Sequence, residues 1–265
     1  MFFDLHNDFP TELDSGRFKD YINRAHGTVT AAIWTSEFGD YEALDRVKKL
    51  TYALAESDIP IAIEDLGFLE RKDAQEKFDF SQYFYCSLTW NYDNIYAGGA
   101  LSLGGLTSRG RAMINIINAS CALDTAHLNR ASFYPAVDAA KHPMCSHTGF
   151  ADCDRCLNDE QIKALVARHG IIGLCAVTRF TGAFDTAGLA RQIDMFTQKY
   201  GSDVLCLGSD FFGSKDLPDD FRDYDGIDRL KAELGKLGYT DDDVDNFLYK
   251  NALRFYEVIQ DERHL

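Results

Sequence analysis

Hydrophobic and polar positions along the chain fall into two alternating patterns. Short, almost wholly apolar runs rich in β-branched and aromatic residues predict buried strands, whereas apolar residues at three- and four-residue spacing predict amphipathic helices. The predicted strands are Phe2–Leu5, Val29–Trp34, Ile59–Ile63, Phe84–Thr89, Cys121–Thr125, Met144–Ser146, Ile171–Val177 and Val204–Gly208. Helical spacing is clearest in Tyr41–Ser57, Thr107–Ala119, Asn158–His169 and Thr186–Tyr200.

The regular alternation of strands and helices favours a parallel sheet covered by helices. Strands buried on both faces are apolar nearly throughout, as Ile171–Val177 is. Eight strands is the number in a (β/α)₈ barrel, a fold that typically takes about 250 residues. We therefore predict an α/β fold in which residues 1–265 form a single (β/α)₈ TIM barrel domain. An open doubly wound sheet is the alternative.

Local signals mark some element ends and loops. The sequence Asn158-Asp159-Glu160-Gln161 is typical of a helix start, with a capping residue followed by acidic residues in the first turn. The glycine-rich segment 98–105 is predicted to be a loop, and the acidic segment 216–228 a solvated surface excursion. No repeat, low-complexity tract or proline-rich linker suggests an internal domain boundary.

Composition narrows the classes of partner. The chain is 46% hydrophobic and 26% charged, as in ordinary globular proteins, and contains no stretch of the roughly 20 apolar residues that a membrane helix needs. The net charge of −15 repels nucleic acid and anionic lipid surfaces, so neither is an expected partner. The first residues lack the pattern of a signal peptide. We expect a cytoplasmic protein.

The seven cysteines are scattered, odd in number and mostly set within apolar runs, which fits a reducing compartment. Cys153 and Cys156 form a CxxC pair that could serve as a redox or metal pair. A single CxxC without a second pair is a weak signal, and we expect two free thiols in a loop.

Candidate chemistry follows the ends of the predicted strands. In a barrel the carboxyl ends of all strands meet at one mouth, where active sites are built. Each residue alone would more often be structural, but together they predict a metal site. The residues at or just past these ends are His6, Asp8, Glu64, His127, His147 and Asp210.

Two of these positions carry their own physical argument. His6 and Asp8 are alternate residues of an extended segment, so both side chains can point to one ion. Glu64 ends the apolar run Ile61-Ala62-Ile63, where an unpaired carboxylate would cost several kcal/mol, on the order of the cost of desolvating an ion. Bridging two cations would remove that cost.

The order of motifs resembles that of the renal (membrane) dipeptidase family over most of the chain, from Phe3 to Ile259. The matching segments are Asp4-Leu5-His6-Asn7-Asp8, Ile63-Glu64, Leu88-Thr89-Trp90-Asn91, Gly105-Leu106-Thr107, Asp124-Thr125-Ala126-His127, Ser146-His147 and Gly208-Ser209-Asp210-Phe211. The resemblance implies a (β/α)₈ barrel with two zinc ions. One ion would be bound by His6 and Asp8 and the other by His127 and His147, with Glu64 bridging both.

The same resemblance implies roles around the metals. Asp210 would be the acid-base carboxylate near the bridging water. Arg155 would bind the substrate carboxylate, if the loop after His147 is about three residues shorter than in the family; an ordinary surface arginine is the alternative. Trp90 and Asn91 would line the substrate pocket.

Trp90 is a departure from the family pattern, because it stands where the family has a histidine that contacts the substrate carbonyl. Loss of a donor to a developing oxyanion can cost roughly 10²–10³ in rate. Trp90 therefore threatens peptide hydrolysis while leaving the metal site intact. Family members are also commonly longer than this chain, so the loops that shape the pocket should differ.

These observations predict a binuclear zinc-dependent dipeptidase that uses a metal-bridging hydroxide. The substrate would be a small molecule, either a dipeptide or an N-acyl amino acid. Zinc is the expected ion, although cobalt and manganese accept the same ligands. The alternatives are another metal-dependent amidohydrolase, acting on a lactam, lactone or N-acyl amine, and a metal-binding barrel that has lost turnover. The family resemblance also favours a homodimer.

Overall fold

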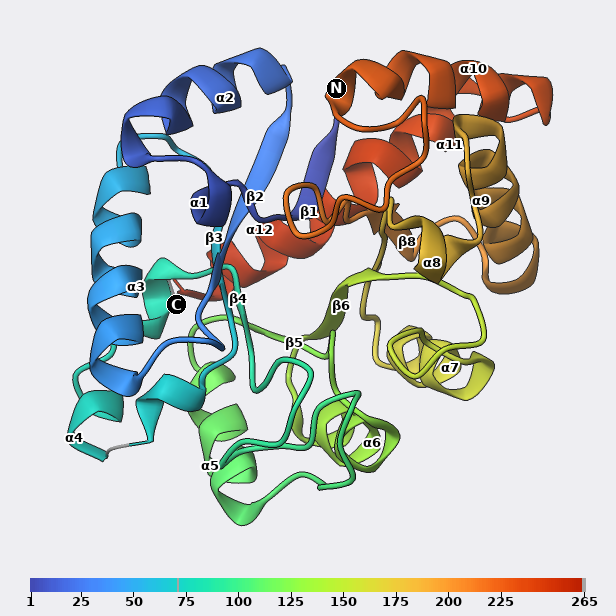
Figure 1. Ribbon diagram of the computed structural model, residues 1–265. Coiled ribbons are helices and arrows are strands. Elements are labelled where there is room, and N and C mark those ends of the chain that lie inside the picture. Colours follow the sequence, from blue (N-terminus) through green and yellow to red (C-terminus); the bar gives the residue numbers. More distant parts are fainter. Residues whose placement is uncertain (71, 264–265) are drawn as a thin grey trace.

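Eight parallel strands close into a barrel in sequence order in the computed structural model, which describes residues 1–70 and 72–263 (Figure 1). The strands are β1 (Phe3–Asn7), β2 (Thr28–Trp34), β3 (Ile61–Glu64), β4 (Tyr85–Ser87), β5 (Ala122–Asp124), β6 (Pro143–Thr148), β7 (Ile172–Leu174) and β8 (Leu205–Leu207). Pairing of Asp4 in β1 with Leu207 in β8 closes the barrel. The predicted (β/α)₈ barrel is confirmed, and the open doubly wound sheet is wrong.

Helices follow the strands and pack around the barrel (Figure 1). They are α1 (Phe9–Glu12), α2 (Phe18–Ala25), α3 (Asp40–Leu54), α4 (Lys72–Gln75), α5 (Ser108–Ile117), α6 (Arg130–Ala139), α7 (Asp159–Ala167), α8 (Thr178–Thr181), α9 (Thr186–Tyr200), α10 (Ile227–Lys236), α11 (Asp241–Asp245) and α12 (Asn251–Arg263). Short 3₁₀ turns lie at Ser15–Arg17, Gly67–Leu69, Phe80–Gln82 and Tyr224–Gly226, and a π-helical turn at Asn246–Lys250. No described helix is long and apolar enough to span a membrane.

The start predicted for α7 is confirmed in detail. The Asn158 side chain accepts from the backbone N–H of Gln161, and the Gln161 side chain accepts from that of Asn158, which is a capping box. The predicted acidic excursion at 216–228 is only partly correct. Phe221 is buried, and the Tyr224 hydroxyl donates to Asp4 in β1 (2.6 Å), so this segment packs against the barrel.

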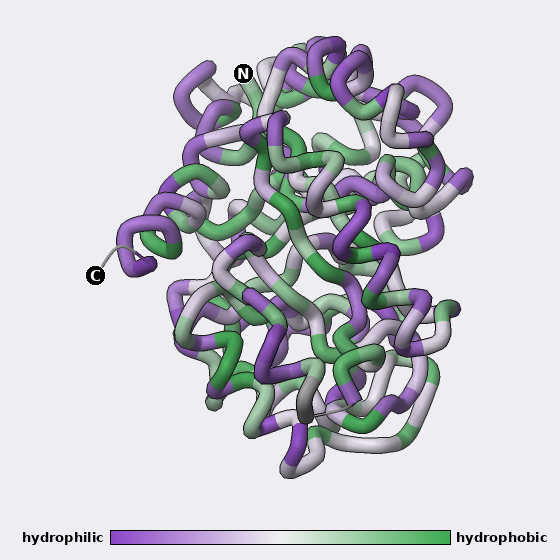
Figure 2. Tube along the Cα trace, turned by 90° about the vertical axis from the view of Figure 1, so that its left-hand side faces the viewer, coloured by the Kyte–Doolittle hydropathy of each residue, from purple (hydrophilic) through white to green (hydrophobic). Residues whose placement is uncertain are grey.

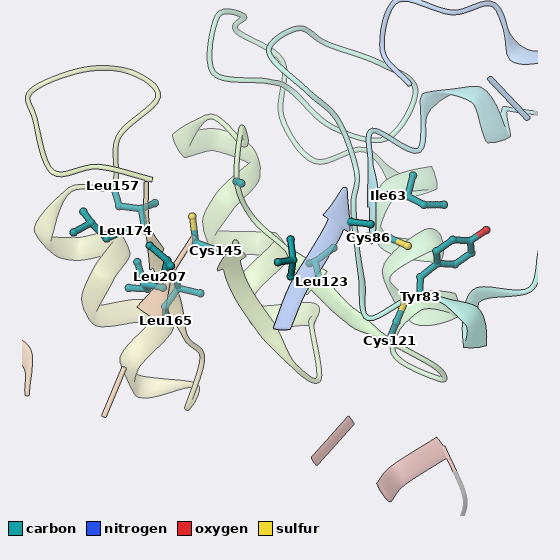
Figure 3. Close-up of a cluster of buried hydrophobic side chains, with 14 of the residues drawn as sticks. Ile63, Tyr83, Cys86, Cys121, Leu123, Cys145, Leu157, Leu165, Leu174 and Leu207 are labelled. Carbon is teal, nitrogen blue, oxygen red and sulfur yellow. The ribbon is translucent and has the colours of Figure 1, made fainter. Parts of the chain in front are cut away.

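The core has two layers that follow the alternation of side chains along each strand. Ile61 and Ile63 of β3 point outward to the helices, while Ala62 points into the barrel. Figure 3 shows part of the outer layer, including Ile63 and Leu165. The more hydrophilic stretches of the chain lie mainly at the outside of the molecule (Figure 2).

Helix α12 closes the end of the barrel where the strands begin. Its residues Ala252, Phe255 and Ile259 belong to the inner cluster, together with Phe3 and Phe84 at the starts of β1 and β4. Burial of these apolar side chains stabilises the packing of α12 against this end of the barrel through the hydrophobic effect. The opposite end, where the strands finish, is therefore the open one.

Candidate metal and substrate site

A cavity of about 320 Å³ lies at the carboxyl ends of the strands. Except for His6, every side chain predicted to take part in the site lines it: Asp8, Glu64, Trp90, Asn91, His127, His147, Arg155 and Asp210. His6 is fully buried beneath the cavity, with its Nε2 3.3 Å from Asp8 Oδ2. The structure thus brings all the predicted positions to one place.

Two of the histidines, His6 and His147, lie in segments of β1 and β6 where the strand pairing is irregular. The register shifts between Asp4 and Asn7 in β1, and between Cys145 and Thr148 in β6. Such shifts break the strict alternation of side chains along a strand and can redirect one of them. The rings of His6 and His147, which lie within the shifted segments, consequently approach with centroids 3.8 Å apart.

Backbone strain is also concentrated here. His127 has a φ of 67° and Asp210 a φ of 60°, in the left-handed region that residues with side chains seldom adopt. The Asp210 backbone is held in place because its N–H donates to the His6 carbonyl (3.1 Å). Strained residues of this kind persist only where the surrounding structure fixes them, and they cluster at functional sites.

The inner nitrogen of His127 is free to accept a cation. Its Nδ1 lies 2.9 Å from the amide oxygen of Asn91, which can only accept, so the proton resides on Nδ1. The unprotonated Nε2 then faces Glu64 Oε1 at 2.7 Å and His147 Nε2 at 3.1 Å. Burial, followed by the charge of Arg155, lowers the pKa of His127 to about 4, so the ring is neutral near pH 7.

His147 has the same arrangement. Its Nδ1 lies 2.8 Å from Ser146 Oγ, which donates its own hydrogen to Asp124 (2.7 Å). His147 must therefore donate from Nδ1, which leaves the lone pair of Nε2 in the cavity. Burial and the charges of His6 and Arg155 hold the pKa of His147 well below its ordinary value.

His6 is oriented by the barrel interior. Its Nδ1 lies 2.8 Å from the Tyr85 hydroxyl, which donates to the Leu5 carbonyl (2.9 Å). Nδ1 is thus the donor and Nε2 points to Asp8. Burial lowers the pKa of His6, but the neighbouring carboxylates, Asp8 first and then Glu64 and Asp210, together outweigh burial and raise it to about 10. The surroundings of His6 Nε2 therefore attract positive charge.

The carboxylates complete a donor set that fits divalent cations. His6, Glu64 and His147 offer ligand atoms within 4.8 Å of one another, as do His6, Asp8 and Asp210. Within the described residues, His6 Nε2 and Asp8 Oδ1 are buried and have no hydrogen-bond partner. Facing lone pairs, unpartnered atoms and crowded carboxylates would each be satisfied by cations bound to nitrogen and oxygen.

The crowding of charged groups shifts the pKa values of two carboxyl groups, those of Asp210 and Glu64. Burial, followed by the charge of Asp8, raises the pKa of Asp210 well above its ordinary value. Burial raises the pKa of Glu64, but the interactions with His127, His6 and Arg155 together outweigh burial and lower the pKa to about 2. Glu64 is therefore ionised between two imidazoles, whereas Asp210 lies beside another carboxylate.

Supporting residues that sequence reasoning missed lie behind the site. Asp4 is buried and accepts from the Ser209 backbone (2.7 Å), the Ser209 hydroxyl and Tyr224. Asp124 similarly fixes Ser146 and, through it, His147. Both are charged residues inside otherwise apolar strands, which is a signal present in the sequence. Their hydrogen bonds fix the orientation of candidate ligands, as outer-shell partners commonly do.

The predicted pair of free thiols is wrong, because Cys153 and Cys156 form a disulfide with their Cα atoms 5.3 Å apart. A tight turn, in which the N–H of Cys156 donates to the Cys153 carbonyl (3.1 Å), brings the Cα atoms into the range for a disulfide. The remaining cysteines are buried and free: Cys86, Cys121, Cys145, Cys175 and Cys206.

Arg155 lies inside the disulfide-closed turn and lines the cavity. Its Nη2 donates to the His147 carbonyl (3.2 Å), and its guanidinium lies 5.8 Å from the centre of the Phe180 ring. Trp90 also lines the cavity and packs edge-on against Trp34, with ring centroids 5.5 Å apart. Its centroid is 5.8 Å from that of His127.

Comparison with known proteins finds relatives among dipeptidases. Residues 82–264 match the membrane dipeptidase family (peptidase family M19). An uncharacterised Klebsiella pneumoniae protein from the pqqA 5′ region is 33% identical over 185 residues, or 62% of this chain and 68% of that protein. Dipeptidase 3 of Rattus norvegicus is 24% identical over 197 residues, which span 68% of this chain but only 40% of the rat protein.

A solved structure shares the fold across the whole barrel. The metallopeptidase from Rhodobacter sphaeroides, liganded with a phosphinate mimic of the dipeptide L-Ala-D-Ala, superposes with a TM-score of 0.82. It is 16% identical in sequence, and the match covers 97% of this chain and 98% of that one. Since the family match covers more than half of the sequence, the chain belongs to the membrane dipeptidase family of metal-dependent hydrolases.

Proposed function

We propose that the protein is a zinc-dependent dipeptidase with two metal ions. The observation that carries this proposal is the convergence of imidazole Nε2 atoms and carboxylates on one cavity that also contains an arginine. His6 and Asp8 would bind one ion, His127 and His147 the other, and Glu64 would bridge them. The short contacts of Glu64 Oε1 with His127 (2.7 Å) and His147 (3.7 Å) support the second group.

Bound divalent ions would supply an activated water, by lowering its pKa, and would polarise the carbonyl of the scissile bond. The residues of the chain have to manage protons and substrate position. Asp210 has no ion-pair partner among the described residues and lies beside Asp8, where it can take the proton of the attacking water. The same carboxyl group can return that proton to the departing amine.

Arg155 is the proposed anchor for the substrate. Its guanidinium is planar, carries its donors in a fork and can bind a carboxylate through two parallel hydrogen bonds. The Nε of Arg155 is buried and has no hydrogen-bond partner within the described chain. Binding of a terminal carboxylate would satisfy it and would place the peptide bond over the candidate metal ligands. A dipeptide or an N-acyl amino acid has the required carboxylate.

Trp90 supports a second candidate, a metal-dependent amidohydrolase with a different substrate. Its indole occupies the cavity wall next to His127, where the family pattern has a histidine. An indole ring offers apolar surface and one N–H donor, but it cannot act as an acid at neutral pH. A lactam, lactone or N-acyl amine with an apolar group could pack against Trp34 and Trp90.

Hydrolysis of a dipeptide panel tests the first proposal. Zinc-loaded protein would be compared with chelator-stripped protein on dipeptides with L- and D-configured C-terminal residues, including L-Ala-D-Ala, whose mimic the Rhodobacter protein binds. Metal-dependent cleavage is expected. If protein verified by elemental analysis to hold two ions cleaves no dipeptide, the dipeptidase proposal fails, and a panel of lactams, lactones and N-acyl amines then tests the second candidate.

A further inference from the structure

A second arginine, Arg179, lines the same cavity as Arg155. It belongs to the short helix α8, which follows β7 at the carboxyl end of the barrel. Its guanidinium lies 4.8 Å from the centre of the Phe180 ring, the same ring that Arg155 approaches at 5.8 Å. Two guanidinium groups therefore lie around one aromatic ring at one end of the cavity.

The segments that carry the two arginines are fixed to each other. The backbone N–H of Ala151 donates to the Phe180 carbonyl (3.0 Å), and the disulfide sulfur of Cys156 lies 3.6 Å from the same oxygen. Gly149 packs so closely that an added Cβ would lie 2.0 Å from that oxygen. The loop with Arg155 and helix α8 thus form one wall, and backbone contacts fix the two segments that carry the arginines relative to each other.

Neither guanidinium forms an ion pair with a carboxylate of the described residues. Within the described residues, no carboxylate lies within ion-pair distance of Arg155 or Arg179, although the protein carries a net charge of −15. The carboxylate of Asp216 accepts a hydrogen bond from the backbone N–H of Arg179 (3.1 Å), which leaves the guanidinium group out of this contact. The arginine end of the cavity is therefore built for more than one negative charge.

We propose that Arg179 is a specificity-determining residue that selects substrates with an acidic C-terminal residue, aspartate or glutamate. This inference rests on the proposed dipeptidase function, in which Arg155 binds the terminal carboxylate. A terminal carboxylate bound through two parallel hydrogen bonds to the fork of Arg155 has both of its oxygens engaged there. The neighbouring Arg179, which is more exposed than Arg155, then faces the side chain of that same residue and favours a second carboxylate there.

The test compares isosteric substrates that differ in one charge. Ala-Asp and Ala-Asn dipeptides, with the C-terminal residue in either configuration, would be hydrolysed by zinc-loaded wild type and by R179Q. The wild type should prefer Ala-Asp on the order of tenfold in kcat/KM, as expected for a charge-assisted hydrogen bond at a partly exposed site. R179Q should lose this preference and keep its rate on Ala-Asn. R179K, which retains the charge but not the fork, should be intermediate.

The matched control is R191Q, which removes an exposed arginine from α9 outside the cavity. This variant should keep the roughly tenfold preference for Ala-Asp over Ala-Asn in kcat/KM. Equal rates on Ala-Asp and Ala-Asn in the wild type would overturn the proposal. A loss in R179Q that is equal for both substrates would overturn it too, because it would indicate a structural role.

Binding of the free amino acids separates this inference from the proposed function. Titration calorimetry with aspartate and asparagine, each in both configurations, should show aspartate binding more tightly, with the difference absent in R179Q. If no dipeptide is cleaved but this difference is found, the proposed function fails and recognition of the second carboxylate by Arg179 stands. If aspartate binds no better than asparagine, the role proposed for Arg179 is wrong even if dipeptides are hydrolysed.

Discussion

Asp210 combines a strained backbone with burial, and it makes no ion pair within the described residues. We predict that D210N lowers kcat by about 10²–10⁴-fold, the range typical of a lost general acid or base. The variant should retain both zinc ions, because the amide keeps the shape of the side chain and the other candidate ligands remain. Elemental analysis beside steady-state kinetics checks this, and full activity would show that Asp210 moves no proton.

Gly213 is required at the site for a steric reason. An added Cβ would lie 2.2 Å from Asp210 Oδ1 and 2.4 Å from Asp8 Oδ2, closer than real contacts. G213A should therefore displace one or both carboxylates and lower zinc affinity at least about tenfold, as changes next to metal ligands commonly do. Competition with a chromogenic chelator measures this affinity.

Gly235 provides the matched control. It lies within α10, where an added Cβ would meet nothing within 4 Å. G235A should leave zinc affinity unchanged and raise the free energy of unfolding by about 0.5–1 kcal/mol, because alanine favours a helix over glycine. Unchanged zinc affinity in G213A would mean that the two carboxylates do not serve the metals.

The turn between Cys153 and Cys156 is the element that positions Arg155. Removing the disulfide should let the turn sample more conformations and so weaken substrate binding without changing the chemistry. We predict that C153S/C156S raises KM by several-fold, about 3- to 10-fold, with little change in kcat, as for a lost ground-state and transition-state contact. Wild type reduced by a dithiol should behave in the same way. A fall in kcat at unchanged KM would contradict this interpretation.

Helix α12 packs at the end of the barrel opposite the cavity. Loss of packing there should lower the free energy of unfolding without changing zinc affinity. F255A removes a ring that packs against Phe84 in the inner cluster and should cost about 3–5 kcal/mol in the free energy of unfolding. V258A, at a site that is 47% exposed, should cost less than about 1 kcal/mol. Denaturant unfolding measures both. Zinc affinity should be unchanged in each variant, and a reduction in F255A would show that the two ends are coupled.

The strands and several helices could be predicted because their burial leaves a periodic pattern, and observed ends such as β2 at Trp34 and α9 at Thr186–Tyr200 agree with it. Helix α12 was missed although Ala252, Phe255 and Ile259 have helical spacing. The register shifts in β1 and β6 could not be predicted, because they depend on pairing between strands distant in sequence. Nothing in the sequence indicated that Arg179 lies at the cavity, because its position follows from how α8 packs on the loop of Arg155.

At the scale of the whole molecule, the barrel separates stability from function: an apolar cluster fills one end and charged groups fill the other. Assembly as a homodimer and a cytoplasmic location stay predictions.

The charged end of the barrel should make the stability of the fold depend on metal, because ions that bind only the native state stabilise it. Chelation should therefore lower the free energy of unfolding by at least about 2.7 kcal/mol when zinc was present at 100 times its Kd. Thermal unfolding with and without chelator measures this loss.

The metal-free protein should reveal how much the crowded carboxylates oppose folding. Burial and Asp8 raise the pKa of Asp210 above its value of 3.8, so the native state holds this proton more tightly than the unfolded state does. The sign follows from linkage: Asp210 stabilises the metal-free fold at low pH, and this contribution is lost as pH rises through the raised pKa. Metal-free D210N, which cannot ionise at this position, should thus be more stable than metal-free wild type, by a margin that grows from pH 5 to pH 8. Urea unfolding in the presence of chelator measures the margin. A margin that is constant over this range would show that Asp210 is already satisfied without metals, and that cations are not what the cavity lacks.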